Sequence, residues 1–433
     1  MCLVRIRSLI LTQNRFPANG QYTYLLRFLT LPPPDNLPSV IDKHTLAKKQ
    51  VPAKIDPVKA KFFAVPGLTS LIALNAFAQT EREAVAHYTQ LVQATYSDAL
   101  AKAKIMERAI EDFLASPSAD GLKKARSSWT AARIPYLQTE VFRFYEGPID
   151  DEDGPEGLLN AWPLDESYVD YVKGDEEAGI INKPDDFPKI DANLIQSLNE
   201  KGGEANISCG YHAIEFLLWG QDFSAGGPGE RPFTDYTTAD NADRRASYLR
   251  ASTKLLIKHL AEVSTEWEPG RENYRSRFLK LEPRAAIEKI LTGMSMLSGF
   301  EMASERLNVA YDTKAQEDEH SCFSDTTHND MVYDLVGISN VWNGTYRTVK
   351  GPGLKEVAEK ADPALAKHLD ARITASVAAA RAIPAPFDQA ILGEDNAPSR
   401  QAILRTIESL EEQAGLMVIL SKKLGFEVPI SED

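Results

Sequence analysis

Cysteine is scarce in this 433-residue sequence, where Cys2, Cys209 and Cys322 are the only three. Three cysteines are too few for the disulfide framework that holds small secreted proteins together. Basic residues are also in deficit, because 62 Asp and Glu outnumber 48 Lys and Arg and give a formal net charge of −14 at pH 7. A nucleic-acid partner is therefore not expected, since phosphate backbones are bound by clustered positive charge.

The sequence also contains no apolar run of the length, about 20 residues, that a membrane-spanning helix needs. The run at 62–74 is shorter; it follows the lysines of 59–61 and precedes Ala-Phe-Ala at 76–78. A basic start, a short apolar stretch and small residues at a cleavage point form the pattern of a secretory signal peptide. We therefore predict a signal peptide at 58–78 and a mature chain without a transmembrane segment.

The pattern at 58–78 ordinarily stands at the start of a protein, yet a proline-rich stretch, 1–57, precedes it here. We interpret 1–57 as a non-native extension that results from placing the start of the gene too early. The alternative is a buried apolar segment behind a genuine N-terminal arm. Under the first interpretation the protein is exported.

Convincing runs of alternating strand pattern are absent, whereas helical spacing is widespread. Apolar residues from Val85 to Phe113 recur at steps of three and four, which is typical of an amphipathic helix. Ser118 and Asp120 are N-cap candidates for the helix that follows. Further helical patterns cover about 240–266, 283–312, 329–348, 354–382 and 403–420.

We predict an all-α fold of two packed helical-bundle lobes, 79–275 and 276–433. Two stretches without helical spacing, Gly147–Pro188 and Gly220–Asp240, are expected to be long loops. The aromatic residues of the first loop favour an ordered structure, with one short helix near 166–172.

The most unusual helical segment is "SCGYHAIEFLLWGQD", which carries His212 and Glu215 inside an apolar run. Residues three apart share one face of a helix, so the two side chains can converge on one ion. A buried His and Glu are costly unless they are paired or bound to metal. A second pair with this spacing, His259 and Glu262, lies in "LIKHLAEVS", for which we expect a solvent-exposed histidine.

A second polar cluster lies in "QEDEHSCFSDTTHNDMVYD", which combines acidic, histidine and cysteine residues. It is either part of a site or a polar loop between two helices, with Ser324 or Asp325 as an N-cap. Cys322 in this stretch and Cys209 beside His212 are the only cysteines left after cleavage at 78. In an oxidising compartment they could form a disulfide; two free buried thiols are the alternative.

The stretch "WTAARIPYLQTEVFRFYEGPID" places Arg133, Glu140 and Arg143 among aromatic residues. A buried arginine usually pairs with a carboxylate, so structural pairing is the expected role of each.

The segment "GYHAIEFLLWGQD" resembles the GxHxxE signature of the imelysin family. "ARIPYLQTEVFRFYEGPID", "GPEGLLNAWPLDE" and "EDEHSCFSDTTHNDM" also resemble that family, in its iron-regulated branch, and the resemblance extends over about 85–425. It implies an all-α fold of two lobes with the GxHxxE helix near their interface. It also implies a bacterial periplasmic or outer-membrane-associated location and a link to iron uptake or regulation, including a partner in envelope iron uptake.

On this resemblance, Gly210, His212 and Glu215 correspond to the GxHxxE motif. The acidic stretch carries over as four further site residues, Glu319, His320, Ser324 and Asp325. The family is filed as metallopeptidases with insulin-cleaving members, but a zincin needs HExxH, and no histidine here begins that motif. Whether the protein is an enzyme is therefore left open.

Four functional hypotheses remain. The first is a binding protein for an iron ion, a related cation or an iron complex, whose ligands come from His212, Glu215, Glu319, His320 and Asp325. The second is a zinc metallopeptidase that uses these residues on a peptide substrate. The third is a di-iron carboxylate bundle, which needs Glu-x-x-His on two helices; only Glu317 and His320 run in that order, in an expected loop. The fourth is a metal-free site in which His212 and Glu215 form hydrogen bonds with Arg133 or Tyr136.

Overall fold

The structure is a computed structural model that describes residues 66–224 and 226–431. The predicted extension 1–57 and the first part of the predicted signal peptide lie outside these residues, and 66–78 form the beginning of the first helix. Nearly all regular structure is helical, as predicted. The α-helices are α1 (Pro66–Ala115), α2 (Ala119–Leu137), α3 (Glu156–Leu159), α4 (Glu166–Val169), α5 (Ala192–Leu198), α6 (Gly210–Trp219), α7 (Ala242–Glu266), α8 (Tyr274–Phe278), α9 (Pro283–Met296), α10 (Val309–Thr313), α11 (Thr327–Asn343), α12 (Leu354–Ala361), α13 (Pro363–Arg381), α14 (Phe387–Ala390) and α15 (Pro398–Leu424).

Shorter helical turns and one small hairpin complete the described structure. The turns of 3-10 type are η1 (Glu140–Phe142), η2 (Ile180–Asn182), η3 (Phe233–Tyr236) and η5 (Gln316–Asp318), and η4 (Leu297–Asn308) is a π-helical stretch. The hairpin pairs β1 (Thr345–Tyr346) with β2 (Val349–Lys350) in antiparallel fashion.

The α1 helix supplies one long wall of the core. Its residues at helical spacing, among them Val92, Tyr96, Met106 and Phe113, are at most 1% exposed. The chain then turns, and Ser118 caps α2 by accepting a hydrogen bond from the Gly121 backbone N–H at 3.1 Å. The sequence therefore predicted both the first helix and the residue that starts the second.

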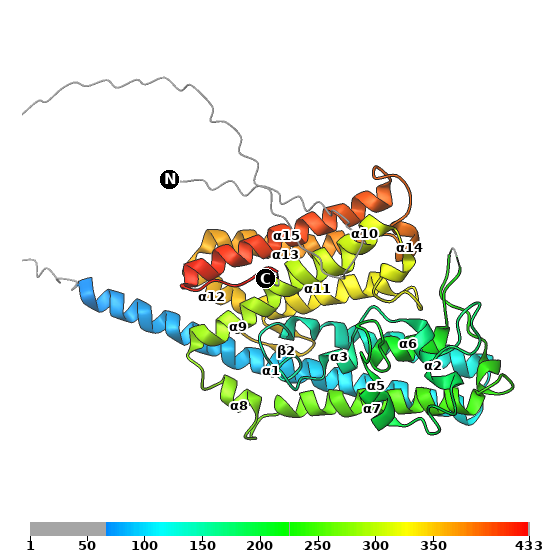
Figure 1. Cartoon of the computed structure of the whole chain (residues 1–433). Coiled ribbons are helices and arrows are strands. Elements are labelled where there is room, and N and C mark those ends of the chain that lie inside the picture. The colour runs from blue at the N-terminus through cyan, green and yellow to red at the C-terminus, as the bar shows by residue number, and fades with distance from the viewer. Residues whose placement is uncertain (1–65, 225, 432–433) are drawn as a thin grey trace, which may run out of the picture. The chain divides into compact units, whose positions relative to one another are not determined.

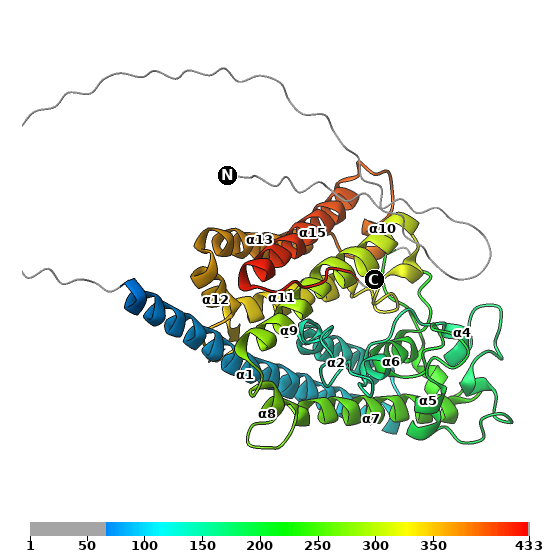
Figure 2. The same cartoon turned by 60° about the vertical axis from the view of Figure 1, so that its left-hand side comes forward.

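The helices pack as antiparallel neighbours (Figures 1 and 2). α1 contacts α2 and α7, α6 lies between α2 and α7, and α15 packs on α13, α9 and η4. In Figure 1 the helices α9–α15 gather in the upper part of the picture and the helices α2–α8 in the lower part. Because α1 contacts members of both groups, the division at 275 and 276 stays a prediction.

Two of the predicted helical patterns differ from the structure, and a third agrees with it in extent. The pattern at 329–348 ends at Asn343, because Gly344 adopts a left-handed backbone conformation, φ +61°, and leads into the hairpin. The pattern at 354–382 is two helices, since Asp362 caps α13 and Pro363 cannot continue α12. The pattern at 283–312 is continuous from α9 through η4 to α10.

The two predicted loops are ordered by one buried ion-pair group. Asp170, at the end of α4, accepts hydrogen bonds at 2.6 Å from Arg231 of the second loop and Arg245 of α7. Asp170 is fully buried and Arg245 is 1% exposed. Both loops are thereby fixed against α7, beside the α6 helix.

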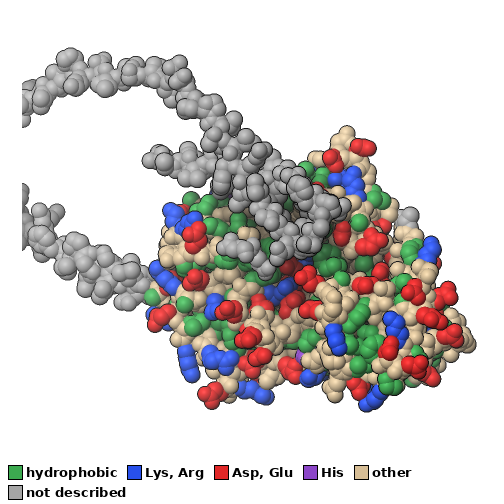
Figure 3. Space-filling view, viewed as in Figure 1, with side chains coloured by type: hydrophobic (Ala, Val, Ile, Leu, Met, Phe, Trp, Pro, Cys, Tyr) green, Lys and Arg blue, Asp and Glu red, His purple; other side chains and the backbone are tan. Residues whose placement is uncertain are grey.

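No helix of residues 66–224 and 226–431 is both long enough and apolar enough to span a membrane. Figure 3 shows Asp and Glu side chains spread over the viewed face of the described residues, among Lys and Arg. The acidic excess on this face is therefore not concentrated in one patch.

Candidate metal centre

The GxHxxE motif begins a helix that is buried at all ten positions, α6. Gly210 adopts φ +87°, and a Cβ at this position would lie 2.8 Å from the Leu159 carbonyl oxygen. Only glycine fits there, so the first residue of the motif allows the close approach of the end of α3. The Trp129 indole N–H donates to the Tyr211 carbonyl at 3.0 Å and ties α2 to α6.

His212 and Glu215 form a hydrogen-bonded pair, with 2.8 Å between Nδ1 and Oε2. The other carboxylate oxygen, Oε1, accepts hydrogen bonds from the Ser324 backbone N–H at 2.9 Å and hydroxyl at 2.6 Å. Glu215 therefore connects α6 to the 319–325 loop. The metal-free hypothesis expected hydrogen bonds from this pair to Arg133 or Tyr136. The hydrogen bonds of the pair are instead to each other and to Ser324.

Burial decides the charge of this pair. Desolvation raises the pKa of Glu215 to about 8, although the hydrogen bonds from Ser324 favour its ionised form. Desolvation, with the positive charge of Arg133, holds the pKa of His212 well below its usual value. Both side chains are therefore largely uncharged at pH 7, and a hydrogen bond rather than opposite charge holds them together. The Nε2 atom of His212 is buried and has no partner.

His320 lies against His212, with ring centroids 4.7 Å apart and ring planes at 73°. Its Nδ1 lies 2.8 Å from Oδ2 of Asp330, which also accepts from the Ser321 hydroxyl at 2.5 Å. Arg133 pairs with Oδ1 of Asp330 at 3.5 Å. A positive charge thus stands beside both imidazoles, which does not favour a cation at this point.

The predicted pairing of the buried arginines is present. Arg143 lies 2.8 Å from Oε2 of Glu140, and Arg306 of η4 lies 2.7 Å from the same oxygen. Arg306 also pairs with Asp334 at 2.7 Å and with Glu301 at 2.6 Å. These ion pairs connect η1, η4 and α11, so their role is structural.

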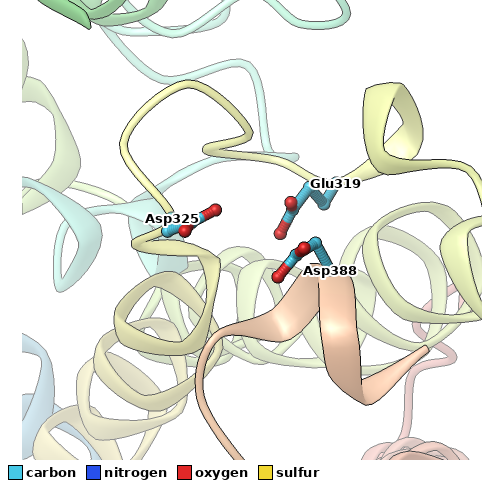
Figure 4. A group of neighbouring side chains, drawn as sticks. All are labelled: Glu319, Asp325 and Asp388. Carbon is cyan, nitrogen blue, oxygen red and sulfur yellow. The ribbon is translucent and has the colours of Figure 1, made fainter. Parts of the chain in front are cut away.

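The carboxylates of Glu319, Asp325 and Asp388 form a separate cluster next to the pair (Figure 4). One oxygen of each lies within 4.8 Å of the others. Glu319 and Asp325 come from the loop before α11, whereas Asp388 comes from α14, and all three side chains point toward a common centre. Within the part of the chain that the structure describes, this is the only such group of three or more His, Cys, Asp and Glu side chains.

The cluster is short of hydrogen-bond donors. Both carboxylate oxygens of Glu319 and of Asp325, and Oδ1 of Asp388, are buried and have no hydrogen-bond partner. Thr327 is near enough to Glu319 to favour its ionised form, without the geometry of a hydrogen bond. Oδ2 of Asp388 accepts from the Gln389 amide at 2.6 Å. Apart from the contact that Asp325 makes with the Asp222 carboxyl, these five buried oxygens therefore lack a hydrogen-bond donor.

Such an arrangement is unfavourable when it is empty. Desolvation and the neighbouring carboxylates raise the pKa of Glu319 well above its usual value. Desolvation, followed by the charges of Asp222 and Asp388, raises the pKa of Asp325 to about 7. A cation would supply the missing positive charge, and hard oxygen donors at this spacing suit iron, manganese, calcium or magnesium.

The five predicted ligands therefore fall into two adjoining groups. Glu319 and Asp325 belong to the carboxylate cluster, and His212, Glu215 and His320 belong to the hydrogen-bonded group. Ser324, which the resemblance included, links the two groups. Sequence reasoning missed Asp388, which lies in a short helix after Pro386, far along the chain and without any spacing relation to the other residues.

The structure agrees with one of the two alternatives for the cysteines and corrects one prediction. Cys209 and Cys322 are both free, and the Cys209 thiol contacts the Leu158 carbonyl at 3.6 Å. His259 was expected to be exposed, yet it is 4% exposed and its Nδ1 lies 2.8 Å from Glu262. The helix face that carries His259 lines a groove together with residues of the 148–158 region.

Comparisons with known proteins agree with this architecture. A crystal structure from Parabacteroides distasonis ATCC 8503, described as an iron-regulated protein A precursor, matches with a TM-score of 0.64 at 19% identity and covers 80% of this chain and 95% of that one. An imelysin-like protein from Psychrobacter arcticum 273-4 matches with a TM-score of 0.59 at 13% identity, over 81% and 98% of the two chains. These two likenesses establish the all-α fold.

Sequence comparison extends the likeness. "Iron-regulated protein A" of Synechococcus elongatus (strain ATCC 33912 / PCC 7942 / FACHB-805) is 25% identical over 339 residues, which cover 76% of this chain and 81% of that protein. The model of the imelysin family, peptidase M75, matches residues 92–417. Because that match runs over most of the sequence and includes α6 and the carboxylate-bearing loop and α14, the chain belongs to the imelysin family.

Proposed function

We propose that this chain is an exported metal-binding protein of the bacterial cell envelope that takes part in iron uptake or its regulation. The cation binds to Glu319, Asp325 and Asp388. The observation that carries this proposal is the set of five buried carboxylate oxygens without a hydrogen-bond partner. The names of two relatives, which are both called iron-regulated protein A or its precursor, support the link to iron.

The GxHxxE pair has a positioning role in this proposal. Glu215 holds Ser324 through two hydrogen bonds, and Ser324 directly precedes Asp325 in the chain. His212 in turn holds Glu215 at 2.8 Å. The motif therefore sets the place of the 319–325 loop, and with it two of the three ligands. The signal-peptide pattern at 58–78 supports the envelope location.

The test is equilibrium binding of Fe(III), Mn(II) and Zn(II) to the purified chain, followed by measurement of bound metal by mass spectrometry. We expect one hard cation per chain, and Asp388→Asn should weaken its affinity at least about tenfold, which is about 1.4 kcal/mol. The matched control is Glu359→Gln, which removes one exposed acidic charge on α12. Absence of bound metal from the wild type, or equal affinity in Asp388→Asn, would reject the proposal.

A zinc metallopeptidase at His212 and His320 is the alternative, favoured by the free Nε2 atom of His212. It needs a third ligand and a general base beside the two rings. Asp330 is a carboxylate in that place, but it is already engaged by His320, Ser321 and Arg133. Hydrolysis of an unfolded protein by the zinc-loaded chain, lost in His212→Ala but kept in Asp388→Asn, would favour this alternative.

A further inference from the structure

The carboxylate cluster has an entrance. A pocket of about 310 Å³ lies beside it, and Asp388 is the one member of the cluster that lines this pocket. Glu319 is fully buried and Asp325 is 7% exposed. A cation that reaches the cluster through this pocket therefore meets the Asp388 side first.

A fourth carboxylate stands at the same entrance. Asp222 lines the pocket together with Asp388, and its side chain contacts that of Asp325. Its two oxygens are held by the Gln316 amide at 2.5 Å and by the Ser224 backbone N–H at 2.8 Å. Asp222 is therefore fixed between the open pocket and the buried cluster.

The lining of the pocket attracts cations. Glu166, Asp222, Glu317 and Asp388 line it, against a single base, Lys314. The Lys314 ammonium donates to the Gly393 carbonyl at 2.7 Å and does not neutralise an acid there. Carboxylates on low-dielectric walls raise the local concentration of cations and their rate of association.

Acidic residues along a pocket do not by themselves show that a cation enters there. The buried Glu319 side chain supplies a second observation, because it marks where an entering cation would bind. Glu319 is fully buried, neither of its oxygens has a partner, and its side chain points at Asp388 and Asp325 (Figure 4). Nothing among the described side chains satisfies it, and a cation that comes past Asp222 and Asp388 would.

We infer that Asp222 is the capture residue of the metal centre: it takes the cation in the pocket and passes it to Glu319, Asp325 and Asp388. This inference rests on the proposed function. It assigns the pocket as the entry route and separates two roles among the carboxylates. Asp222 governs the rate of entry, and Asp388 governs the affinity.

Terbium(III), a hard cation with a luminescence that tryptophan sensitises, provides the probe. The Trp162 indole donates to the Glu319 main-chain carbonyl at 3.0 Å, so an ion in the cluster lies next to an indole. Stopped-flow mixing of the full chain with terbium(III), with excitation of tryptophan, gives the association rate. Titration gives the affinity, and Trp162→Phe confirms that the signal comes from this site.

Asp222→Asn should lower the association rate about tenfold, the lower end of electrostatic rate effects, and change the dissociation constant much less. Asp388→Asn should abolish most of the affinity. Glu317→Gln is the matched control, because it removes one exposed acid from the same lining, and its association rate should stay within about twofold of the wild type.

The outcomes separate the two claims. If the wild type binds and Asp388→Asn does not, but Asp222→Asn associates as fast as Glu317→Gln, the capture role is wrong and the proposed function stands. If Asp222→Asn loses affinity as completely as Asp388→Asn, Asp222 is an ordinary ligand and the capture role is again wrong. If the wild type gives no signal that depends on Trp162, both the proposed function and the capture role are overturned.

Discussion

At the scale of single residues, the geometry of the site depends on a few positions at which adding or removing one side-chain atom would break a contact. Gly210 is one of them, because its backbone conformation and the near Leu159 carbonyl both exclude a side chain. Ser324 is another, because its hydroxyl and backbone N–H are the donors that satisfy Oε1 of Glu215.

Gly210→Ala should lower the free energy of unfolding by about 2 kcal/mol or more, since φ +87° is unfavourable for alanine and the new Cβ would lie 2.8 Å from a backbone oxygen. Chemical denaturation measures this change. Gly415→Ala in α15 is the control: nothing lies within 4 Å of its added Cβ, and alanine should stabilise that helix by about 0.5–1 kcal/mol. Equal effects at both positions would contradict this account of the motif.

Ser324→Ala removes the 2.6 Å hydrogen bond to Glu215 and leaves the backbone donor in place. We expect a loss of about 1 kcal/mol in the free energy of unfolding. Metal affinity should also fall, because Asp325 follows directly in the loop. The exposed Ser197→Ala should change neither quantity. An unchanged metal affinity in Ser324→Ala would show that the GxHxxE helix does not position the loop.

At the scale of elements, the helices are joined by buried charge as well as by apolar packing. Arg306 of η4, Glu140 of η1 and Asp334 of α11 form one network at distances of 2.7 Å. Breaking such a network leaves a buried charge without a partner, which usually costs more than the network contributes.

The network also gives a pH dependence whose sign can be stated. Burial alone would raise the pKa of Glu140, but Arg143 and Arg306 outweigh it and lower this pKa from 4.5 to about 2. A depressed pKa in the folded state contributes stability above pH 4.5 that is lost as the pH falls toward 2. Urea denaturation should therefore show the largest stability difference between wild type and Glu140→Gln above pH 5, and a shrinking one below pH 4. A difference that grows on acidification would contradict the pairing.

At the scale of the whole molecule, metal binding should be visible as added stability. A ligand that binds only the folded chain adds about 2.7 kcal/mol at a free concentration of 100 times its dissociation constant. Thermal unfolding of the wild type should shift upward when a hard cation is added and return when a chelator is added. Asp388→Asn should show a clearly smaller shift at the same concentration of the cation. A shift of equal size in that variant would place the ion elsewhere.

The positions of the helices show which features of the fold can be predicted from the spacing of apolar residues. The steps of three and four from Val85 to Phe113 predicted the buried face of α1, and Ser118 predicted the start of α2. The pattern at 329–348 ran past the true end of α11, because a left-handed glycine and a two-residue hairpin carry no periodic signal.

Part of the candidate site could likewise be predicted from the sequence. The apolar run around His212 and Glu215 was enough to predict a buried pair, since burial of a whole helix appears as hydrophobicity on every side. The sequence also brought Glu319, His320 and Asp325 together, because they lie within one short loop. Local order along the chain determined these neighbours.

Only the tertiary structure decided what these residues meet. Asp388 reaches the cluster because α14 packs beside the 319–325 loop, and no spacing rule connects residues so far apart in sequence. His259 is only 4% exposed because of the packing around α7, and the Cys209 thiol contacts the Leu158 carbonyl rather than Cys322. Periodicity reports which face of an element is buried, whereas the identity of the neighbour across that face depends on the packing of the whole chain.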